Sequence, residues 1–511
     1  MLDIVIRGGM VVDGSGAPAF RADVGLSGDR ITAVGPLPDA RAWTVIDATR
    51  RYVCPGFIDT HVHGDAAVFD PGTQLAALRQ GVTTLLLGQD GLSFAPAGPA
   101  TIGFVTRYFA PVNGAHPALG GDAVTVADLL ATYDRRVPLN TAYLIPHGTV
   151  RHDVMGPAPR APDGDELAAM RALVEAGLDQ GAAGLSTGLE YAPGRYADAA
   201  EIAALCAPVA GAGLPYVTHM RGYEAAAADG MAEVTEIARR SGVAAHVSHY
   251  HGPAARLAAL VDDARAGGLD LTFDSYPYVR GSSTLAMVTL PDRVPAADTD
   301  AALAAVEGLD FAGLEDVWPR ITLSHVPADD LRWAEGLSLP EAAARAGCQP
   351  AGFCRSVLLA TRLEAGCVFG FPGADSEDSM RALLRHPAQM GGSDGIYRGG
   401  HPHPRGWGAF ARLLGRHVRD LGDWTWEQAA LHLAGHPARR FRLLDRGLVR
   451  RSHAADILVI DPATVADQAT YASPKELAIG VEHVIVNGVQ VLSGGTLTHA
   501  GRTAGRVLRP R

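Results

Sequence analysis

The sequence predicts an α/β protein whose main part is a (β/α)8 TIM-like barrel, joined to a small β-sandwich-like domain formed from both termini. Strand-like apolar runs alternate with helical stretches rich in Ala, Leu, Glu and Arg through most of the chain, as in parallel βα units. Both ends instead carry short β-branched runs separated by Gly and Asp. The 511 residues leave room for a barrel of ~250 residues or more and a second domain.

The two terminal segments, residues 1–53 and 440–511, are expected to pair into the small β domain. Near the start of the chain, residues 4–6, 10–12 and 31–34 have the β-branched character of strands. Near its end, residues 455–460 and 481–486 have the same character, and Asn487-Gly488 follows the second run. Because Asn-Gly between apolar runs is a strong hairpin signal, a β-hairpin is predicted there.

Residues 54–439 are predicted to form the barrel, with an insertion around residues 285–390, a stretch longer than one βα unit. The apolar runs end in polar or Gly-rich turns, at residues 61–63, 88–90, 146–148, 186–188, 218–220, 248–250, 274–276 and 392–394. A barrel carries its catalytic groups at the carboxyl ends of its strands, so the site is expected at these turns.

Composition excludes several classes of protein. Hydrophobic residues make up 47% of the chain and the mean hydropathy is +0.07, which is too apolar for a disordered protein. With 55 acidic against 44 basic residues the net charge is −11, so neither nucleic acid nor an anionic membrane surface is an expected partner. The sequence has no apolar run near ~18 residues and no signal-peptide pattern. A cytoplasmic protein acting on a small molecule is predicted, and a homo-oligomer is left open.

Histidines at the strand ends predict a metal site. His61 and His63, spaced i and i+2 at the end of a strand, face the same way. His219 and His249 each close an apolar run, and Asp394 ends the last strand. Neutral imidazole suits zinc, and this set indicates a hydrolytic site with one or two zinc ions. Any one of these residues alone could be an ordinary core or surface side chain with no role in metal binding, but that does not explain the whole set.

Several motifs then resemble a known family. Residues 55–63, Pro-Gly-Phe-Ile-Asp-Thr-His-Val-His, resemble the first-strand signature of the amidohydrolase superfamily. Further motifs resemble the N-acyl-D-amino-acid deacylases (D-aminoacylases), in the same order over nearly the whole chain; they lie at residues 146–151, 184–189, 218–221, 276–278, 392–395 and 401–405.

The resemblance implies a barrel with a small β domain and zinc-dependent hydrolysis of the amide bond of N-acyl-D-amino acids. By the same resemblance, His219 and His249 match the histidines of a tight zinc site. His61, His63 and Asp394 match a second, weaker metal position, and Asp394 also matches the catalytic acid and base.

The chain departs from the family at three positions. Asp90 stands where well-known members carry a Cys ligand, so a harder carboxylate replaces a thiolate and looser metal binding is expected; a turn Asp before Gly is the alternative. Lys475 is the only lysine among the 44 basic residues, which excludes the carboxylated-lysine subtype of the superfamily. His251 takes the place of a Lys that holds the substrate carboxylate, and is a weaker, pH-dependent cation.

Besides His251, four residues are predicted to contact the substrate, and three of these four match family positions. Arg405 matches a carboxylate-binding position, which suits its bidentate guanidinium. Tyr276 and Ser282 match substrate-contacting residues, and the Tyr276 phenol is a donor for the developing oxyanion. Arg280 has no family counterpart; it is either a substitute for the lost lysine or a surface charge.

Three other functions are weighed against this one. A cyclic-amide hydrolase, resembling a hydantoinase or dihydropyrimidinase, would use the carboxylated lysine that is missing here. A metal-free binding scaffold would have no need for the histidine set. Residues 184–188 fit the Gly-x-Ser-x-Gly pattern of serine hydrolases, but a loop sequence follows Ser186 where that motif requires a helix.

Overall fold

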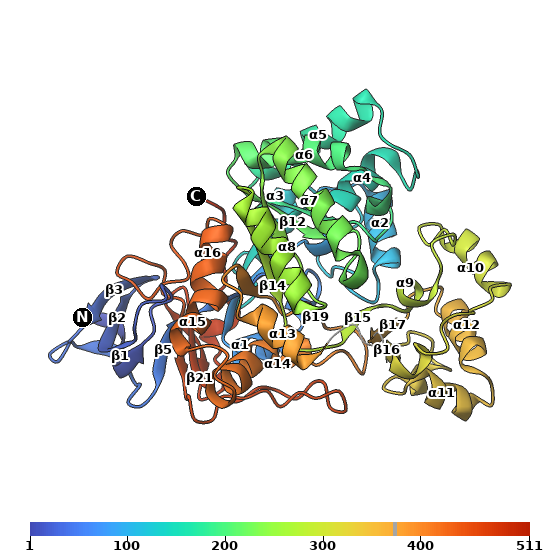
Figure 1. The fold of residues 1–511 in the computed structure, drawn as a ribbon. Coiled ribbons are helices and arrows are strands. Elements are labelled where there is room, and N and C mark those ends of the chain that lie inside the picture. Colours follow the sequence, from blue (N-terminus) through green and yellow to red (C-terminus); the bar gives the residue numbers. More distant parts are fainter. Residues whose placement is uncertain (371–375) are drawn as a thin grey trace.

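The computed structural model describes residues 1–370 and 376–511 and shows an α/β fold. Figure 1 shows three parts in a row: a β sheet from the two ends of the chain, a central part of strands and helices, and a smaller helical part around α10 to α12. Among the described residues, no helix has both the length and the apolar character that crossing a membrane requires.

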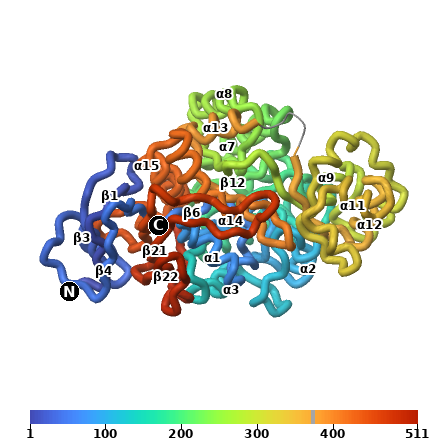
Figure 2. The backbone as a smooth tube through the Cα atoms, turned by 90° about the horizontal axis from the view of Figure 1, so that it is seen from below, coloured from blue at the N-terminus to red at the C-terminus, as the bar shows by residue number. Residues whose placement is uncertain are grey.

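The strands from the two ends form one nine-stranded mixed sheet, in which β20 pairs antiparallel with β5 and places Leu458 opposite Cys54. Figure 2 shows these N- and C-terminal strands side by side. The predicted hairpin is confirmed: Val486 pairs with Val489, and Asn487 and Gly488 have the positive φ angles of 49° and 79° that such a turn needs. The strands are β1 (Leu2–Val11), β2 (Phe20–Ser27), β3 (Arg30–Gly35), β4 (Ala42–Asp47), β5 (Tyr52–Pro55), β20 (Ile457–Ile460), β21 (Val481–Val486), β22 (Val489–Ser493) and β23 (Thr496–Leu497).

The central part contains parallel strands in the order β6-β8-β9 and β10-β11-β12-β13-β14-β18. The two runs join at Leu144, the single residue between β9 and β10. Its N–H donates to Leu87 O, at the end of β8, at 2.9 Å, so β9 and β10 continue one another in the sheet. The first and last strands also meet: Thr60 N–H donates to Gly391 O at 3.3 Å, and β7 pairs with β19. The strands are β6 (Phe57–Asp59), β7 (Val62–His63), β8 (Val82–Leu87), β9 (Asn140–Tyr143), β10 (Ile145–Pro146), β11 (Leu185–Gly188), β12 (Pro215–His219), β13 (Ala244–Val247), β14 (Leu271–Ser275), β18 (Gln389–Gly391) and β19 (Gly395–Ile396).

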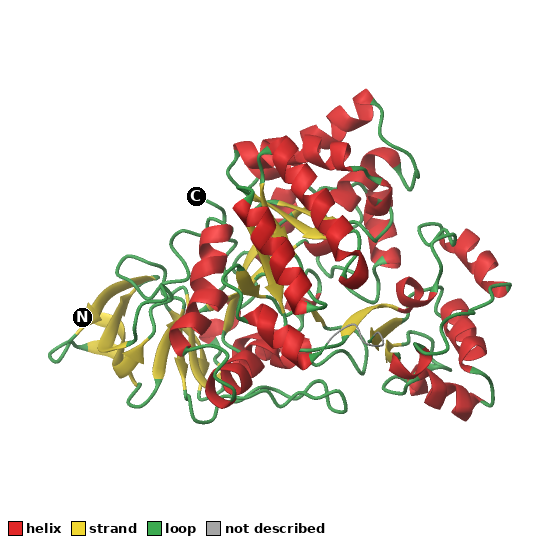
Figure 3. Ribbon diagram, in the orientation of Figure 1, coloured by secondary structure: helices red, strands yellow, loops and turns green. Residues whose placement is uncertain are grey.

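Helices cover the outside of these strands (Figure 3). Their side chains and those of the strands form the largest hydrophobic core, which includes Leu85, Ile145, Tyr216 and Phe273. The helices are α1 (Pro71–Arg79), α2 (Pro99–Tyr108), α3 (Val126–Tyr133), α4 (His147–Met155), α5 (Gly164–Asp179), α6 (Ala199–Gly211), α7 (Ala227–Ser241), α8 (Ala254–Ala266), α13 (Glu377–Leu384), α14 (Arg405–Arg412), α15 (Trp426–Ala430) and α16 (His436–Arg440).

A second, separate hydrophobic core lies between Leu285 and Cys367, within the region where the sequence places an insertion. It packs around the sheet β15-β17-β16. Its elements are β15 (Gly281–Thr284), α9 (Leu285–Thr289), α10 (Thr299–Glu307), β16 (Thr322–His325), α11 (Leu339–Ala346), α12 (Pro350–Ala360) and β17 (Gly366–Phe369). Residues 371–375 of the predicted insertion lie outside the described residues, and the exact domain boundaries stay a prediction.

Candidate metal centre

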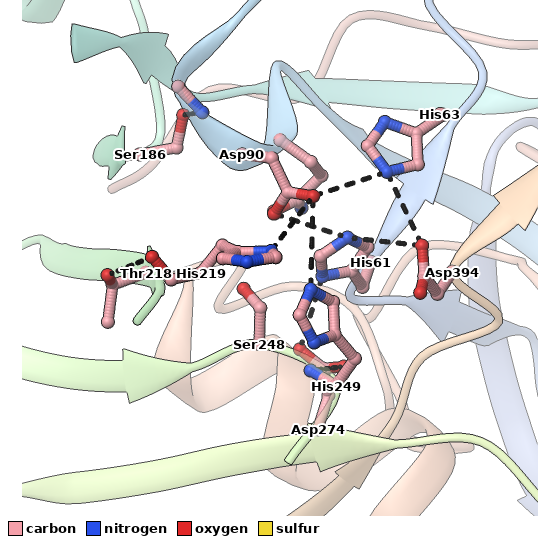
Figure 4. A network of polar contacts seen from close by, with 12 residues as sticks. His61, His63, Asp90, Ser186, Thr218, His219, Ser248, His249, Asp274 and Asp394 are labelled. Carbon is pink, nitrogen blue, oxygen red and sulfur yellow. Dashed lines mark hydrogen bonds and ion pairs between the residues drawn. The ribbon is translucent and has the colours of Figure 1, made fainter. Parts of the chain in front are cut away.

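The six predicted metal ligands come together at the carboxyl ends of the parallel strands (Figure 4). All six are buried. They follow or end β6, β7, β8, β12, β13 and β18, and are His61, His63, Asp90, His219, His249 and Asp394. Three of them have backbone angles that are rare outside glycine, with φ of 54° at Asp90, 38° at His249 and 48° at Asp394. Such conformations concentrate at functional sites, where the surrounding structure holds them.

Asp90 lies at the centre of the cluster. Its Oδ1 is 3.6 Å from His61 Nε2. Its Oδ2 is 3.5 Å from His63 Nε2, 3.7 Å from His219 Nδ1 and 3.9 Å from His249 Nε2. One carboxylate therefore faces all four histidines, a position from which it can serve two neighbouring metal ions.

Asp394 joins the cluster from the opposite side. Its Oδ1 is 3.6 Å from His61 Nε2 and 3.4 Å from His63 Nε2. Its Oδ2 forms an ion pair with Arg405 Nη1 at 2.8 Å. Gly392, two residues earlier, packs closely against the cluster, because a Cβ there would lie 2.9 Å from both His61 Cβ and Asp274 Oδ1.

The donor set fits a metal ion. Among the described residues, no hydrogen bond reaches either ring nitrogen of His61, Nδ1 of His63 or His219, or Oδ1 of Asp90. Buried polar atoms without partners are uncommon, so a missing ligand is the simplest explanation. Ligand atoms of His61, His63 and Asp394 lie within 4.8 Å of one another, as do those of His61, Asp90 and His249. Imidazole nitrogens with carboxylate oxygens are a donor set that zinc accepts.

The electrostatics of the cluster lead to the same conclusion. Burial by itself lowers the pKa of a histidine, yet the carboxylates around them raise the pKa of His63 to about 9 and that of His219 to about 10. Burial raises the pKa of Asp394, but the charges of Arg405 and His61 outweigh it and hold that pKa below its usual range. The buried carboxylates are thus ionised and attract cations, whether protons or a metal.

Two carboxylates that the sequence analysis did not assign hold the histidines in place. Asp274, at the end of β14, accepts the backbone N–H of His249 at 2.7 Å and contacts His246 Nε2 at 3.0 Å. Glu190 Oε2 lies 2.9 Å from His219 Nε2. Carboxylates in this position orient metal-binding imidazoles. Asp274 was detectable as another acid at a strand end, whereas no sequence signal marks Glu190 beyond its place after the 184–189 motif.

A cavity of about 320 Å³ opens beside the cluster. Of the residues that the sequence analysis predicts to contact the substrate, Tyr276, Ser282, Arg405 and His251 line it. Arg405 is fully buried there, with its guanidinium 4.6 Å from the centre of the Tyr276 ring. Among the described residues its Nε has no hydrogen-bond partner. Ser282 also lines the cavity, with its hydroxyl donating to Cys367 O at 3.0 Å.

The two remaining candidate cations differ in placement. The His251 ring lines the cavity, stacks on Tyr223 and has its Nε2 3.8 Å from Glu224 Oε1. Arg280 is not among the described residues that line the cavity; its guanidinium lies 4.8 Å from the centre of the Tyr471 ring. That placement gives no support to Arg280 as a substrate ligand.

The arrangement of Ser186 does not support a serine nucleophile. Its hydroxyl donates to Gly88 O and accepts the N–H of Gly91, so it is held by the backbone of the loop that carries Asp90. The placement of Lys475 does not support a catalytic role either, because its ammonium is exposed and donates to Gly399 O at 2.7 Å.

Histidines and carboxylates at the ends of parallel strands, beside a cavity with a buried arginine, define a metal-dependent hydrolase site. The chain belongs to the amidohydrolase family, whose model matches residues 44–492. It is 37% identical to N-acyl-D-glutamate deacylase and 35% identical to D-aminoacylase, both from Alcaligenes xylosoxydans xylosoxydans; each match covers 99% of this chain, and 96% and 97% of the relatives.

A solved structure matches equally completely. It is the N-acyl-D-glutamate deacylase from Bordetella bronchiseptica, complexed with zinc and a phosphonate inhibitor that mimics the tetrahedral intermediate of the reaction. The TM-score is 0.84 with 34% identity, and the match covers 99% of both chains. The resemblance seen in the sequence is therefore confirmed.

Proposed function

We propose that this protein is a zinc-dependent hydrolase that cleaves the amide bond of N-acyl-D-amino acids to a carboxylate and a free amine. The observation that carries the proposal is the position of Asp394 between the histidine cluster and Arg405. One of its carboxylate oxygens faces the histidines, and the other pairs with Arg405. A reacting amide and a substrate carboxylate would thus be held side by side. The similarity to deacylases over the full chain supports the same reaction.

The architecture proposed for this activity is a closed (β/α)8 barrel with the terminal segments, 1–53 and 440–511, as a separate β domain. Support for closure comes from the bond between Thr60 and Gly391 and from the pairing of β7 with β19, which link the first strand position to the last. Closure would place all six candidate ligands at one mouth.

His219, His249 and Asp90 would hold one zinc ion, and His61, His63 and Asp394 an adjacent metal position. When bound, zinc supplies a Lewis acid that polarises the amide carbonyl and makes a water molecule a better nucleophile at neutral pH. The central place of Asp90 suits a carboxylate shared between the two positions.

Asp394 is proposed as the proton carrier. Its ion pair with Arg405 keeps the carboxylate ionised, so it is ready to accept a proton from the attacking water. It then delivers that proton to the amine nitrogen as the C–N bond breaks. Tyr276, on the cavity wall, would donate its phenol hydrogen to the carbonyl oxygen as negative charge develops there.

Arg405 is proposed to bind the free carboxylate of the substrate, with Ser282 and His251 beside it. Among the described residues, Nε of the buried guanidinium has no hydrogen-bond partner, while Nη1 pairs with Asp394. A buried arginine on the lining of a cavity is a natural partner for an anionic ligand.

The test is a substrate screen with the purified protein as isolated, after removal of metal with a chelator, and after zinc is added back. N-acetyl-D-amino acids should be hydrolysed, their L-isomers and hydantoins should not, and the activity should disappear and return with zinc. Hydrolysis of hydantoins alone would assign the chain to cyclic-amide hydrolases instead. No hydrolysis by the zinc-loaded protein would favour a binding scaffold.

A further inference from the structure

We propose that the cavity selects N-acyl-D-amino acids with an apolar side chain and rejects those with a second carboxylate, such as D-glutamate and D-aspartate derivatives. The proposal rests on the proposed function, because it takes Arg405 as the ligand of the substrate's α-carboxylate. It concerns the part of the cavity that would receive the amino acid's side chain.

The position of that part follows from substrate geometry. The side chain and the carboxylate leave the same Cα atom, so the side chain must lie within a few ångströms of the group that binds the carboxylate. Arg405 Nη2 is 3.5 Å from Ser282 O, which places the guanidinium against β15. The substrate side chain would therefore meet β15 and the helix α9 that follows it directly.

The cavity surface formed by these elements, by β17 and by Val279 just before β15 carries the Ser282 and Ser283 side chains and is otherwise apolar. Its apolar part consists of Val279, Gly281, Met287, Val288 and Phe369, and we call it the β15–α9 wall. Gly281 pairs with Phe369 across the sheet, and a Cβ at residue 281 would lie 2.7 Å from the Phe369 ring. The aromatic ring therefore covers the strand, and a matching substrate group gains free energy by burying its apolar surface there.

Among the described residues, the cavity lining offers no spare arginine or lysine to a second carboxylate. Arg405 is the only arginine or lysine among the described residues that line the cavity. The undescribed residues 371–375 contain no Lys, Arg or His. His251 Nε2 lies 3.8 Å from Glu224 Oε1, so an acid already stands beside this ring.

Other arginines near the cavity are also occupied. Arg280, next to the lining residue Gly281, has its guanidinium 4.8 Å from the centre of the Tyr471 ring. Arg195 and Arg221 line a neighbouring cavity. Arg195 is paired with Asp292 at 2.8 Å, and Arg221 with Glu233 at 3.1 Å. A second substrate carboxylate would thus lose its water without gaining a cationic partner, and Glu190 and Glu224 on the cavity lining would repel it.

This expectation sets the chain apart from the relatives named for D-glutamate, despite their similarity in sequence. Specificity is a difference between two affinities, and it depends on the few groups around the substrate side chain rather than on identity over the whole chain.

The first test uses the unmodified zinc-loaded protein and three substrates of similar size: the N-acetyl derivatives of D-methionine, D-glutamine and D-glutamate. The expected order of kcat/KM is methionine, then glutamine, then glutamate, with at least about 100-fold between the first and last. A glutamate derivative hydrolysed as fast as the methionine one would overturn the inference and leave the proposed function standing. Hydrolysis of none of the three would overturn both.

The second test changes the wall itself. Met287→Arg should lower kcat/KM for the methionine substrate and raise it for the glutamate substrate, each by about 10-fold, because it adds the missing cation. Met287→Leu is the matched control and should stay within about threefold of the original values, since it conserves volume and polarity. Zinc content should be unchanged in both variants. An unaltered preference in Met287→Arg would show that the substrate side chain does not meet this wall.

Discussion

Arg405→Ala is expected to remove two separate contributions of one guanidinium: its bond to the substrate carboxylate and its ion pair with Asp394. Arg405 Nη1 lies 2.8 Å from Asp394 Oδ2, and Nε has no hydrogen-bond partner in the part of the chain that the structure describes. A charge-assisted bond to the substrate carboxylate is worth ~1.5–3 kcal/mol, so its loss should lower kcat/KM by roughly 10- to 200-fold. Loss of the bond to Asp394 disturbs the proton carrier, and should lower kcat for every substrate alike.

The assay compares N-acetyl-D-methionine with the same compound whose carboxylate is blocked as an amide. The amide cannot use the carboxylate contact, so it should show only the second effect, and the ratio between the two substrates should fall by roughly 10- to 200-fold in Arg405→Ala. Arg171→Ala, at an exposed arginine that pairs with Glu175, is the control and should leave the ratio unchanged. Equal losses on both substrates would refute the assignment of Arg405 to the substrate carboxylate.

Four further outcomes are expected. Asp394→Asn should keep the fold and lower kcat by ~100-fold or more, because proton transfer contributes that much, and near-normal turnover in steady-state assays would reject its role. His219→Ala should lose zinc and activity together, measured by metal analysis, while the exposed His499→Ala should lose neither. Asp90→Cys should bind zinc roughly 10-fold more tightly in a chelator competition, since thiolate is the softer ligand, and looser binding would argue against Asp90 as a ligand. Asp423 is buried beside Arg381 and His417, and although burial raises its pKa, these partners lower it to about 2. A carboxylate with a depressed pKa stabilises the fold fully above pH ~4, and this contribution is lost as the pH falls through ~2. Asp423→Asn should therefore lower the free energy of unfolding by about 2 kcal/mol at pH 7, and by progressively less below pH 4, as measured by urea titration. A loss of stability that does not depend on pH would contradict this.

The elements with a strong local signal could be predicted from the sequence. The i, i+2 spacing of His61 and His63 after an apolar run indicated two ligands on one side, and both rings are buried with their centres 5.4 Å apart. The Asn487-Gly488 hairpin follows from the same kind of local chemistry, since few residues accept two consecutive positive φ angles.

What depends on contacts between distant segments could not be predicted. Arg280 lies only two residues before Ser282, yet its guanidinium stacks on Tyr471. Arg405 at the start of α14 pairs with Asp394, and Glu190 pairs with His219 at the end of β12. Each pair joins residues from separate βα units, and no periodicity in the sequence indicates it. The apolar β15–α9 wall likewise appears only once β15 and β17 have paired.

The measurement that tests the central claim most directly is a zinc titration of the metal-free protein, with hydrolysis of N-acetyl-D-methionine followed at each step. The account predicts that the activity rises with bound zinc, reaches its maximum at one or two ions per chain, and does not appear in His219→Ala at the same zinc concentrations. Full activity in the metal-free protein, or full activity in His219→Ala, would contradict it.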